Sequence, residues 1–363
     1  MTNRYKVYTK VLKALKAMVT FSRQGHLVTL AMLVSGLVTG RKAQLSAISM
    51  EVPTTIQVSS VEMRLRRWVK NPRIAVEAVY LPFAQQVLQA LAASGPLVLV
   101  MDGSQIGRGC QVLMVGVVYK KRALPLAWVV YRGKKGHTTA QRHIQALEKV
   151  LPLIPEGAEV ILLGDAEYDT TEMGLWLQRH TAWQFVLRTS PQIHVVEDGK
   201  SQPIGDYTLQ RGRVFHRAGV GFTRDAPFTV NLIGWWGRRH QRPIYLMTSL
   251  QNPYRACRYY RRRAHIETLF SDKKSRGFHV HKSHLADPCR LNRLLLAVCL
   301  AYLWMIGQGI EVMASGKARW IDRPNRRDKS IFRLGLDWLK YALTRGLDFE
   351  VSFHFRPLEQ LTL

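Results

Sequence analysis

The spacing of apolar residues changes character at about residue 93. Before this point, apolar positions recur with a helical period, as across residues 27–38, and Gly40 and Pro53 interrupt the pattern. After it, short continuous apolar runs alternate with turns and helical stretches. These runs predict buried strands at 97–101, 111–119, 124–131, 160–163 and 183–187, with helices at 138–151 and 169–180. Three successive strands followed by alternating helices and strands predict an α/β fold, with a mixed sheet and flanking helices.

The remaining segments complete a three-part organisation. Residues 190–250 are rich in Gly, Arg and short apolar runs, which indicates a β-rich insertion. A charged helix follows from about Tyr254, then an apolar helix at 290–310 and an amphipathic helix at 330–344. We therefore expect a helical domain at 1–93, a mixed α/β domain at 94–310 and a helical C-terminal region at 311–363.

The charge of the chain indicates a polyanionic partner. There are 53 Lys and Arg residues against 25 Asp and Glu residues, so the formal net charge is +28. Basic side chains placed against phosphates release condensed counterions, which makes nucleic acid the expected partner. An anionic membrane is the alternative. However, no lipid-binding amphipathic helix stands out, and the most apolar run, 294–306, is shorter than the ~18 residues of a membrane span.

A basic helix in the N-terminal domain is the first candidate for DNA contact. Ser59 and Glu62 have the spacing of a capping box, which predicts that a helix begins there. Several short helices with an Arg-rich last one favour a DNA-binding domain of the helix-turn-helix type, whereas a helical bundle with a solvated basic face is the alternative. The polar side of this helix carries four basic residues, Arg64, Arg66, Arg67 and Lys70.

Cysteine and histidine patterns exclude several classes of protein. The four cysteines lie far apart without a C-x-x-C pair, which argues against a zinc ribbon or a disulfide scaffold and fits a reducing cytosol. No signal peptide is expected around the apolar run at 27–38. His279, His281 and His284 favour a phosphate contact or a surface loop over a zinc site, because no Cys pair accompanies them. The G-x4-G-K-[ST] pattern is absent from the sequence, so ATP use is not indicated.

Two isolated aspartates follow buried strands. Asp102 is the only acidic residue between Ala78 and Leu147, and Asp165 ends the strand at 160–163. Strands one and four are candidate neighbours, which would bring these carboxylates together, and like charges at close range are costly without a cation. Carboxylates are also the ligands that Mg²⁺ prefers. The alternative is that each aspartate only forms a turn.

The charged helix near residue 260 adds a third acidic residue. At about 100° per residue, four side chains project within roughly 60° of one another on a continuous helix. They are Tyr260, Arg263, Glu267 and Lys274. A salt-bridged, solvated face would look similar. A phosphodiester needs cations to neutralise it and a carboxylate to share a metal, and this stripe offers both.

These residues resemble a known signature. The spacing Tyr260-x2-Arg263-x3-Glu267-x6-Lys274 is similar to the Tyr-Arg-Glu-Lys signature of the IS-four family, the DDE transposases of bacterial insertion sequences. The first and second catalytic aspartates of that family resemble Asp102 in VLVMDGSQIG and Asp165 in VILLGDAEYD. The resemblance covers about residues 95–310. It implies a ribonuclease-H-like catalytic core that a β-rich insertion interrupts before the helix bearing Glu267.

The resemblance also implies a role for each of these residues. Asp102, Asp165 and Glu267 would form the catalytic metal triad. Arg263 and Lys274 would bind backbone phosphates of the transposon end, and Tyr260 would contact the terminal phosphate. A tryptophan in the insertion, Trp235 or Trp236, would stack on a flipped base.

The implied activity is cleavage and strand transfer of double-stranded DNA. Two Mg²⁺ ions, with Mn²⁺ able to substitute, would serve hydrolysis at the terminal inverted repeats and then joining to target DNA. A homodimer on paired ends, in the nucleoid of a prokaryotic cytoplasm, is the expected assembly. The alternatives are a metal-dependent DNA nuclease of the same fold and a non-catalytic DNA-binding descendant.

Overall fold

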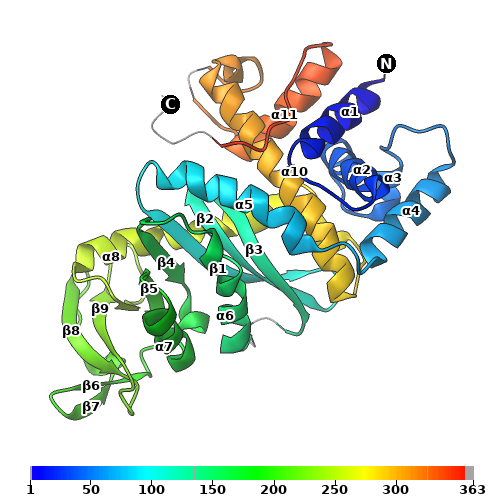
Figure 1. Cartoon of the computed structure of the whole chain (residues 1–363). Helices are drawn as coiled ribbons and strands as arrows, with labels where there is room; N and C mark the ends of the chain where they lie inside the picture. Colours follow the sequence, from blue (N-terminus) through cyan, green and yellow to red (C-terminus); the bar gives the residue numbers. More distant parts are fainter. Residues whose placement is uncertain (1, 135, 137, 325, 356–363) are drawn as a thin grey trace.

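In the part of the chain that the computed structural model describes, residues 2–134, 136, 138–324 and 326–355, ten strands form one sheet (Figure 1). Its strand order is β3-β2-β1-β4-β5-β10-β9-β8-β6-β7. The strands are β1 (Leu97–Ile106), β2 (Cys110–Tyr119), β3 (Arg122–Arg132), β4 (Val160–Gly164), β5 (Gln184–Thr189), β6 (His194–Glu197), β7 (Lys200–Pro203), β8 (Val214–Phe222), β9 (Thr229–Trp235) and β10 (Ile244–Thr248).

The first five strands have the ribonuclease-H-like arrangement. β1, β2 and β3 form an antiparallel meander, while β4 pairs in parallel with β1 and β5 pairs in parallel with β4. The helices α6 (Ala140–Glu148) and α7 (Thr171–His180) connect β3 to β4 and β4 to β5. The predicted mixed sheet with flanking helices is therefore confirmed, because the continuous apolar runs that predicted it are the fully buried strands.

The β-rich stretch expected at about 190–250 continues this sheet. β10 pairs in antiparallel register with β5, and β9, β8, β6 and β7 follow outward. Figure 1 shows these strands at the lower left, at the end of the molecule away from the chain termini. The insertion thus shares its backbone hydrogen bonds with the core and is not a separate sheet.

One long helix occupies the centre of the molecule. α10 (Pro288–Ala314) packs against β3 and against the helices of both ends of the chain. Among the described residues it is the one helix long and apolar enough to cross a membrane, but 89% of its most apolar window is buried inside the protein. Tyr302 and Trp304 have no exposed surface. It is a core helix, as the apolar run at 290–310 predicts.

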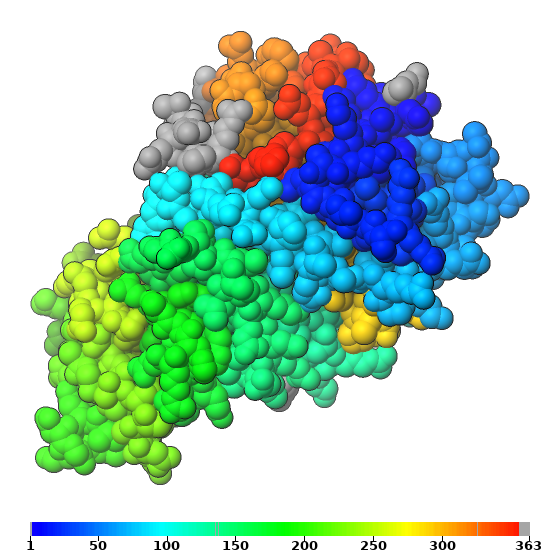
Figure 2. All heavy atoms as spheres, in the orientation of Figure 1, coloured from blue at the N-terminus to red at the C-terminus, as the bar shows by residue number. Residues whose placement is uncertain are grey.

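The N-terminal and C-terminal helices pack together around α10 (Figures 1 and 2). Ion pairs cross between the two ends, with Arg41 3.3 Å from Asp337 and Lys10 2.8 Å from Asp348. The helices are α1 (Asn3–Lys16), α2 (Gln24–Gly40), α3 (Leu45–Ser49), α4 (Val58–Lys70), α5 (Val76–Ala92) and, at the C-terminal end, α11 (Ile331–Thr344).

Two helix starts differ from the sequence prediction. α4 begins at Val58, and its N-cap Gln57 makes no side-chain cap, so Ser59 does not cap the helix. Glu62 pairs instead with Arg66 at 2.5 Å, one turn along the same helix. The second start is that of α7, which the sequence predicts at residue 169: the Thr170 hydroxyl accepts the N-cap hydrogen bond from Met173, and the helix begins at Thr171. Residues that can cap a helix are common near its start, so the pattern alone misplaces such a start.

Candidate functional site

The first two acids lie at one edge of the sheet. The last parallel pair between β1 and β4 joins Val100 to Leu163, and Asp102 and Asp165 each follow two residues later. β1 does not end at Met101 as predicted, because β2 continues to pair with it as far as Ile106. Asp102 is therefore held within a strand. Asp165 leaves β4 and caps the 3₁₀ helix η2 (Ala166–Tyr168).

The predicted continuous helix near residue 260 is wrong. α8 (Pro253–Tyr260) ends in the 3₁₀ helix η4 (Arg261–Ala264), and α9 (His265–Lys273) follows. A 3₁₀ segment has 3.0 residues per turn, so it rotates the side chains after it away from an α-helical stripe. Lys274 lies just beyond α9, and its Nζ is 2.7 Å from Ser104 Oγ on β1. The stripe is thus replaced by a cluster that the tertiary fold assembles.

Arg263 is the centre of that cluster. Its Nη1 lies 3.7 Å from Asp102 Oδ2 and 3.6 Å from Asp165 Oδ2, and its Nη2 lies 3.1 Å from Glu267 Oε1. The Arg263 side chain is 16% exposed, whereas that of Glu267 is 60% exposed. The structure therefore brings the three predicted acids around one guanidinium. We call Asp102, Asp165 and Glu267 the acid cluster.

The acid cluster sets the charge state of Arg263. Burial disfavours the charged guanidinium, but Asp165, Tyr260, Asp102 and Glu267 together outweigh it, and the net effect raises the pKa of Arg263. The mostly buried guanidinium therefore stays charged and neutralises the acids around it.

The donor set of the acid cluster suits a hard divalent cation. Its three carboxylates supply only oxygen ligands, and they already converge on a positive charge. Within the described residues, however, no three His, Cys, Asp or Glu side chains are grouped so that they could hold a metal ion as they stand. Because the guanidinium fills the centre, a metal would bind here only after Arg263 moved away.

Tyr260 and Arg188 flank the cluster. Tyr260 is 8% exposed; burial and nearby Asp165 raise its pKa, while Arg263 and Arg188 act in the opposite direction. Arg188 on β5 lies 3.7 Å from Asp165. Sequence reasoning missed Arg188, although it is the one exposed position in the otherwise mostly buried strand β5. A charged residue within a strand of mostly apolar residues could have indicated it from the sequence.

The two tryptophans of the insertion are already in contact with neighbouring groups. The Trp235 ring on β9 is 7% exposed, with the Arg261 guanidinium 4.9 Å from its centre and the His240 ring at 4.6 Å. Trp236 is partly buried and donates from Nε1 to the His240 carbonyl at 3.1 Å. Trp235 thus lies beside the segment that carries Arg263, with its ring covered.

The basic residues of α4 lie on the N-terminal helices. Arg64 donates to Thr29 Oγ1 at 2.9 Å, and Arg66 is paired with Glu62, whereas Arg67 and Lys70 are exposed. α4 packs against α2, α3 and α10. The structure therefore does not bring these four residues to the acid cluster, and two of the four already make contacts within the helical region.

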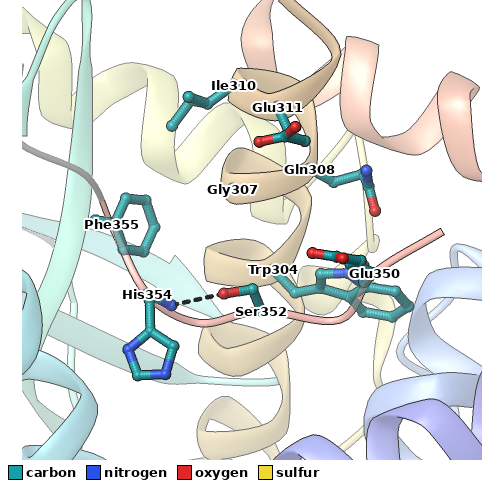
Figure 3. Close-up of a pocket in the computed structure, with 9 residues that line it drawn as sticks. All are labelled: Trp304, Gly307, Gln308, Ile310, Glu311, Glu350, Ser352, His354 and Phe355. Atoms are coloured by element: carbon teal, nitrogen blue, oxygen red, sulfur yellow. Dashed lines mark hydrogen bonds between the residues drawn. The ribbon is translucent and has the colours of Figure 1, made fainter. Parts of the chain in front are cut away.

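Two other features include none of the three acids. A cavity of about 200 Å³ between α10 and the C-terminal segment is lined by Trp304, Gln308, Glu350 and His354 among others, and it holds none of the three acids (Figure 3). His279 and His281 have ring centres 6.0 Å apart, and no metal-binding group of three is found among the described residues.

Comparison with known proteins gives the family. Residues 94–304, more than half of the chain, match the family described as Transposase DDE domain. The chain belongs to this family. No curated protein matches it in sequence. A cryo-EM structure of a piggyBac transposase synaptic complex with hairpin DNA is similar, at 12% identity and a TM-score of 0.47, over 94% of this chain and 78% of that one.

Proposed function

We propose that this DDE transposase is of the IS-four type. It would bind the terminal inverted repeats of its insertion sequence, cleave the DNA there with Mg²⁺ and transfer the freed 3′ end to target DNA. The observation that carries this proposal is the convergence of Asp102, Asp165 and Glu267 on one guanidinium. Membership of the family supports a DNA-cutting and joining enzyme. The spacing of Tyr260, Arg263, Glu267 and Lys274 supports the IS-four assignment.

The acid cluster would hold the metal. Two bound Mg²⁺ ions, or Mn²⁺ in their place, would polarise the scissile phosphate and stabilise the leaving 3′ oxygen. The contribution of the chain is to fix Asp102 within a paired strand and Asp165 at the start of η2, so that two of the three acids stand on rigid backbone. Glu267, on a more exposed side chain, would complete the set.

Arg263 would exchange partners when DNA binds. A phosphodiester arriving at the acid cluster is an alternative anion for its guanidinium, which suits phosphate geometry. Movement of Arg263 to the phosphate would release three carboxylates together. Metal binding and DNA binding would then support each other. DNA would take Arg263 away from the three carboxylates, and the metal would compensate their charge. The metal in turn would displace Arg263, and a DNA phosphate would pair with it.

Lys274 and Tyr260 would position the DNA backbone. The Lys274 ammonium is 2.7 Å from Ser104, two residues beyond Asp102 on the same strand, so it would neutralise a phosphate next to the reacting one. Tyr260, beside Asp165 and Arg188, would contact the terminal phosphate through its hydroxyl group.

The synaptic assembly is the last part of the proposal. Because two ends must be paired before joining, we expect a homodimer on double-stranded DNA, in the nucleoid of a prokaryotic cytoplasm, with Arg67 and Lys70 of α4 adding contacts to the repeat. The net charge of +28 supports a DNA partner. Sedimentation with and without end DNA would measure the stoichiometry.

A cleavage assay tests the proposed function. The purified protein, the Glu267→Gln variant and the control Glu159→Gln would be incubated with Mg²⁺ and DNA carrying the native flanks of the gene, and breaks would be mapped. Glu159 is also exposed, but it pairs with Arg255 outside the acid cluster. Discrete cuts at inverted repeats, lost only in Glu267→Gln, are expected. Cuts scattered along the DNA would show a general nuclease instead. Binding to the ends without any cut would show a non-catalytic DNA-binding descendant.

A further inference from the structure

An exposed tryptophan stands on the surface near the C-terminal end of the chain. Trp320 ends the 3₁₀ helix η6 (Lys317–Trp320), and it remains 49% exposed. Its ring packs against two aromatic rings of α11, Trp338 at 5.9 Å and Tyr341 at 6.3 Å between centres. Large aromatic side chains are usually buried. The Trp320 ring is held in place by two other rings, yet about half of the side chain remains exposed to solvent, as at many binding sites.

Two surface hollows meet at this tryptophan. One, of about 440 Å³, is lined by Trp320, Ile321, Asp322, Arg323, Asp328 and Lys329. The other, of about 490 Å³, is also lined by Trp320, Ile321 and Lys329, together with Asp337, Lys340, Tyr341 and Thr344 of α11 and Arg345, which follows it. Trp320, Ile321 and Lys329 therefore border both hollows. A flat group stacked on the indole could place its flanking groups in the two hollows.

The acidic residues of this region are all engaged by neighbours. Asp328 pairs with Arg323 at 3.1 Å and with Arg326 at 2.7 Å. Asp337 pairs with three cations, Arg41, Lys329 and Arg333. Asp322 accepts backbone N–H groups from Arg323 and Lys329. Neighbouring cations thus compensate the charges of Asp328 and Asp337.

Several cations remain for a partner. Lys317 lies 5.5 Å from the centre of the Trp338 ring, and Arg345 lies 5.5 Å from the centre of the Tyr341 ring. Together with Lys340, these two make no ion pair with a carboxylate of the residues that the structure describes. An anionic polymer with flat groups complements such a surface, because cations track its backbone while a base stacks on the aromatic ring.

We propose that Trp320 and Tyr341 with Lys317, Lys340 and Arg345, the C-terminal aromatic surface, bind single-stranded DNA by stacking an unpaired base on Trp320. Trp338, which is 3% exposed, packs against the Trp320 ring from within the protein. A duplex keeps its bases stacked on one another, so the exposed indole favours unpaired DNA. The inference goes beyond the proposed function, since none of these residues belongs to the acid cluster or to α4, and Figure 1 shows α11 at the opposite end of the molecule from the insertion.

Binding of a labelled oligothymidylate, followed by fluorescence anisotropy without divalent metal, tests the proposal. Trp320→Ala is expected to weaken binding about tenfold, and Trp320→Phe to retain most of it. The double variant Lys340→Ala/Arg345→Ala should lower the salt slope by about 1.4, for two phosphate contacts on a single strand. The control is Tyr254→Ala, which removes a 68% exposed aromatic residue from α8.

Three results would overturn the proposal. The first is that Trp320→Ala and the double variant both bind oligothymidylate with unchanged affinity. The second is that the protein binds duplex DNA more tightly than single strands and that this binding depends on Trp320. The third is that Trp320→Ala changes only the oligomeric state of the protein. The double variant changes exposed charges only, so it tests binding even if Trp320→Ala unfolds. Glu267→Gln should bind oligothymidylate normally, which separates this inference from failure of the proposed cleavage activity.

Discussion

Arg263 Nη2 lies 3.1 Å from Glu267 Oε1, one helical turn further along the chain. The same guanidinium contacts both aspartates, so a single basic side chain compensates the acids that would bind a metal. On the proposed function, the arginine and a divalent cation would therefore compete for one position.

Replacement of Arg263 tests this competition. In Arg263→Ala, without DNA, Mn²⁺ is expected to bind roughly tenfold more tightly, or ~1.4 kcal/mol, because no guanidinium has to be displaced. Mn²⁺ titration followed by electron paramagnetic resonance measures the change. The neighbouring Arg262→Ala is the control, since Arg262 contacts the Tyr259 ring instead. Equal Mn²⁺ affinity in both variants would show that Arg263 does not obstruct the acids.

Lys274 and Ser104 should differ in their effect on cleavage. Lys274→Ala removes a phosphate-neutralising charge and is expected to slow end cleavage roughly 100-fold. Ser104→Ala removes only the hydroxyl group 2.7 Å from the ammonium, and its effect should stay below about tenfold. Single-turnover cleavage with Lys282→Ala as an exposed basic control makes the comparison. If the cleavage rate falls equally in the Lys274 and Ser104 variants, Lys274 acts only through its contact with Ser104 and does not neutralise a phosphate.

The buried ion pair of Arg122 and Asp272 should govern stability. The two side chains hydrogen-bond within the core, and Asp272 is 1% exposed. Arg122→Met leaves a buried carboxylate without its partner and is expected to cost about 3–5 kcal/mol of unfolding free energy. Urea denaturation measures it. The double variant Arg122→Met/Asp272→Leu should recover most of this loss; if it is as unstable as the single variant, packing rather than charge is responsible.

His143 should make the protein acid-sensitive. Burial lowers its pKa to about 4, against the nearby charge of Glu167. The unfolded chain binds a proton near pH 6.5 while the folded one does not, so unfolding free energy is lost as pH falls from about 6.5 toward 4. At pH 5 the loss is about 2 kcal/mol. His143→Leu should remove that part of the difference between pH 7 and pH 5 in denaturation experiments. An unaltered pH dependence would assign the effect to other groups.

The core strands follow directly from the sequence, because strands buried on both faces are continuous apolar runs. β1 and β4 and the position of Asp165 were predictable on that basis. The continuation of β1 through Asp102 was not. The pair Asp102-Gly103 predicts a turn, and only the partner strand β2 shows that the pairing persists. The residues of β1 alone do not reveal how far β2 pairs with it.

The break between α8 and α9 was hidden for a similar reason. No Pro or Gly interrupts residues 254–273, so the local signal is that of one helix. Within the 3₁₀ segment, Arg263 pairs with Asp102 on β1 and with Asp165 just beyond β4, both far from it in sequence. The sequence therefore predicts which residues form the motif and in what order. The orientation of their side chains depends on contacts with residues that are distant along the chain.

The position of α10 has a consequence for synthesis of the protein. The helix α2, in which Leu30 and Leu33 are buried, packs in part against α10, which begins more than 250 residues after these leucines. A nascent chain must therefore carry the N-terminal helices with their apolar side uncovered until α10 has left the ribosome. Chaperone capture of the growing chain, and aggregation of fragments that stop before residue 288, follow from this late closure of the core.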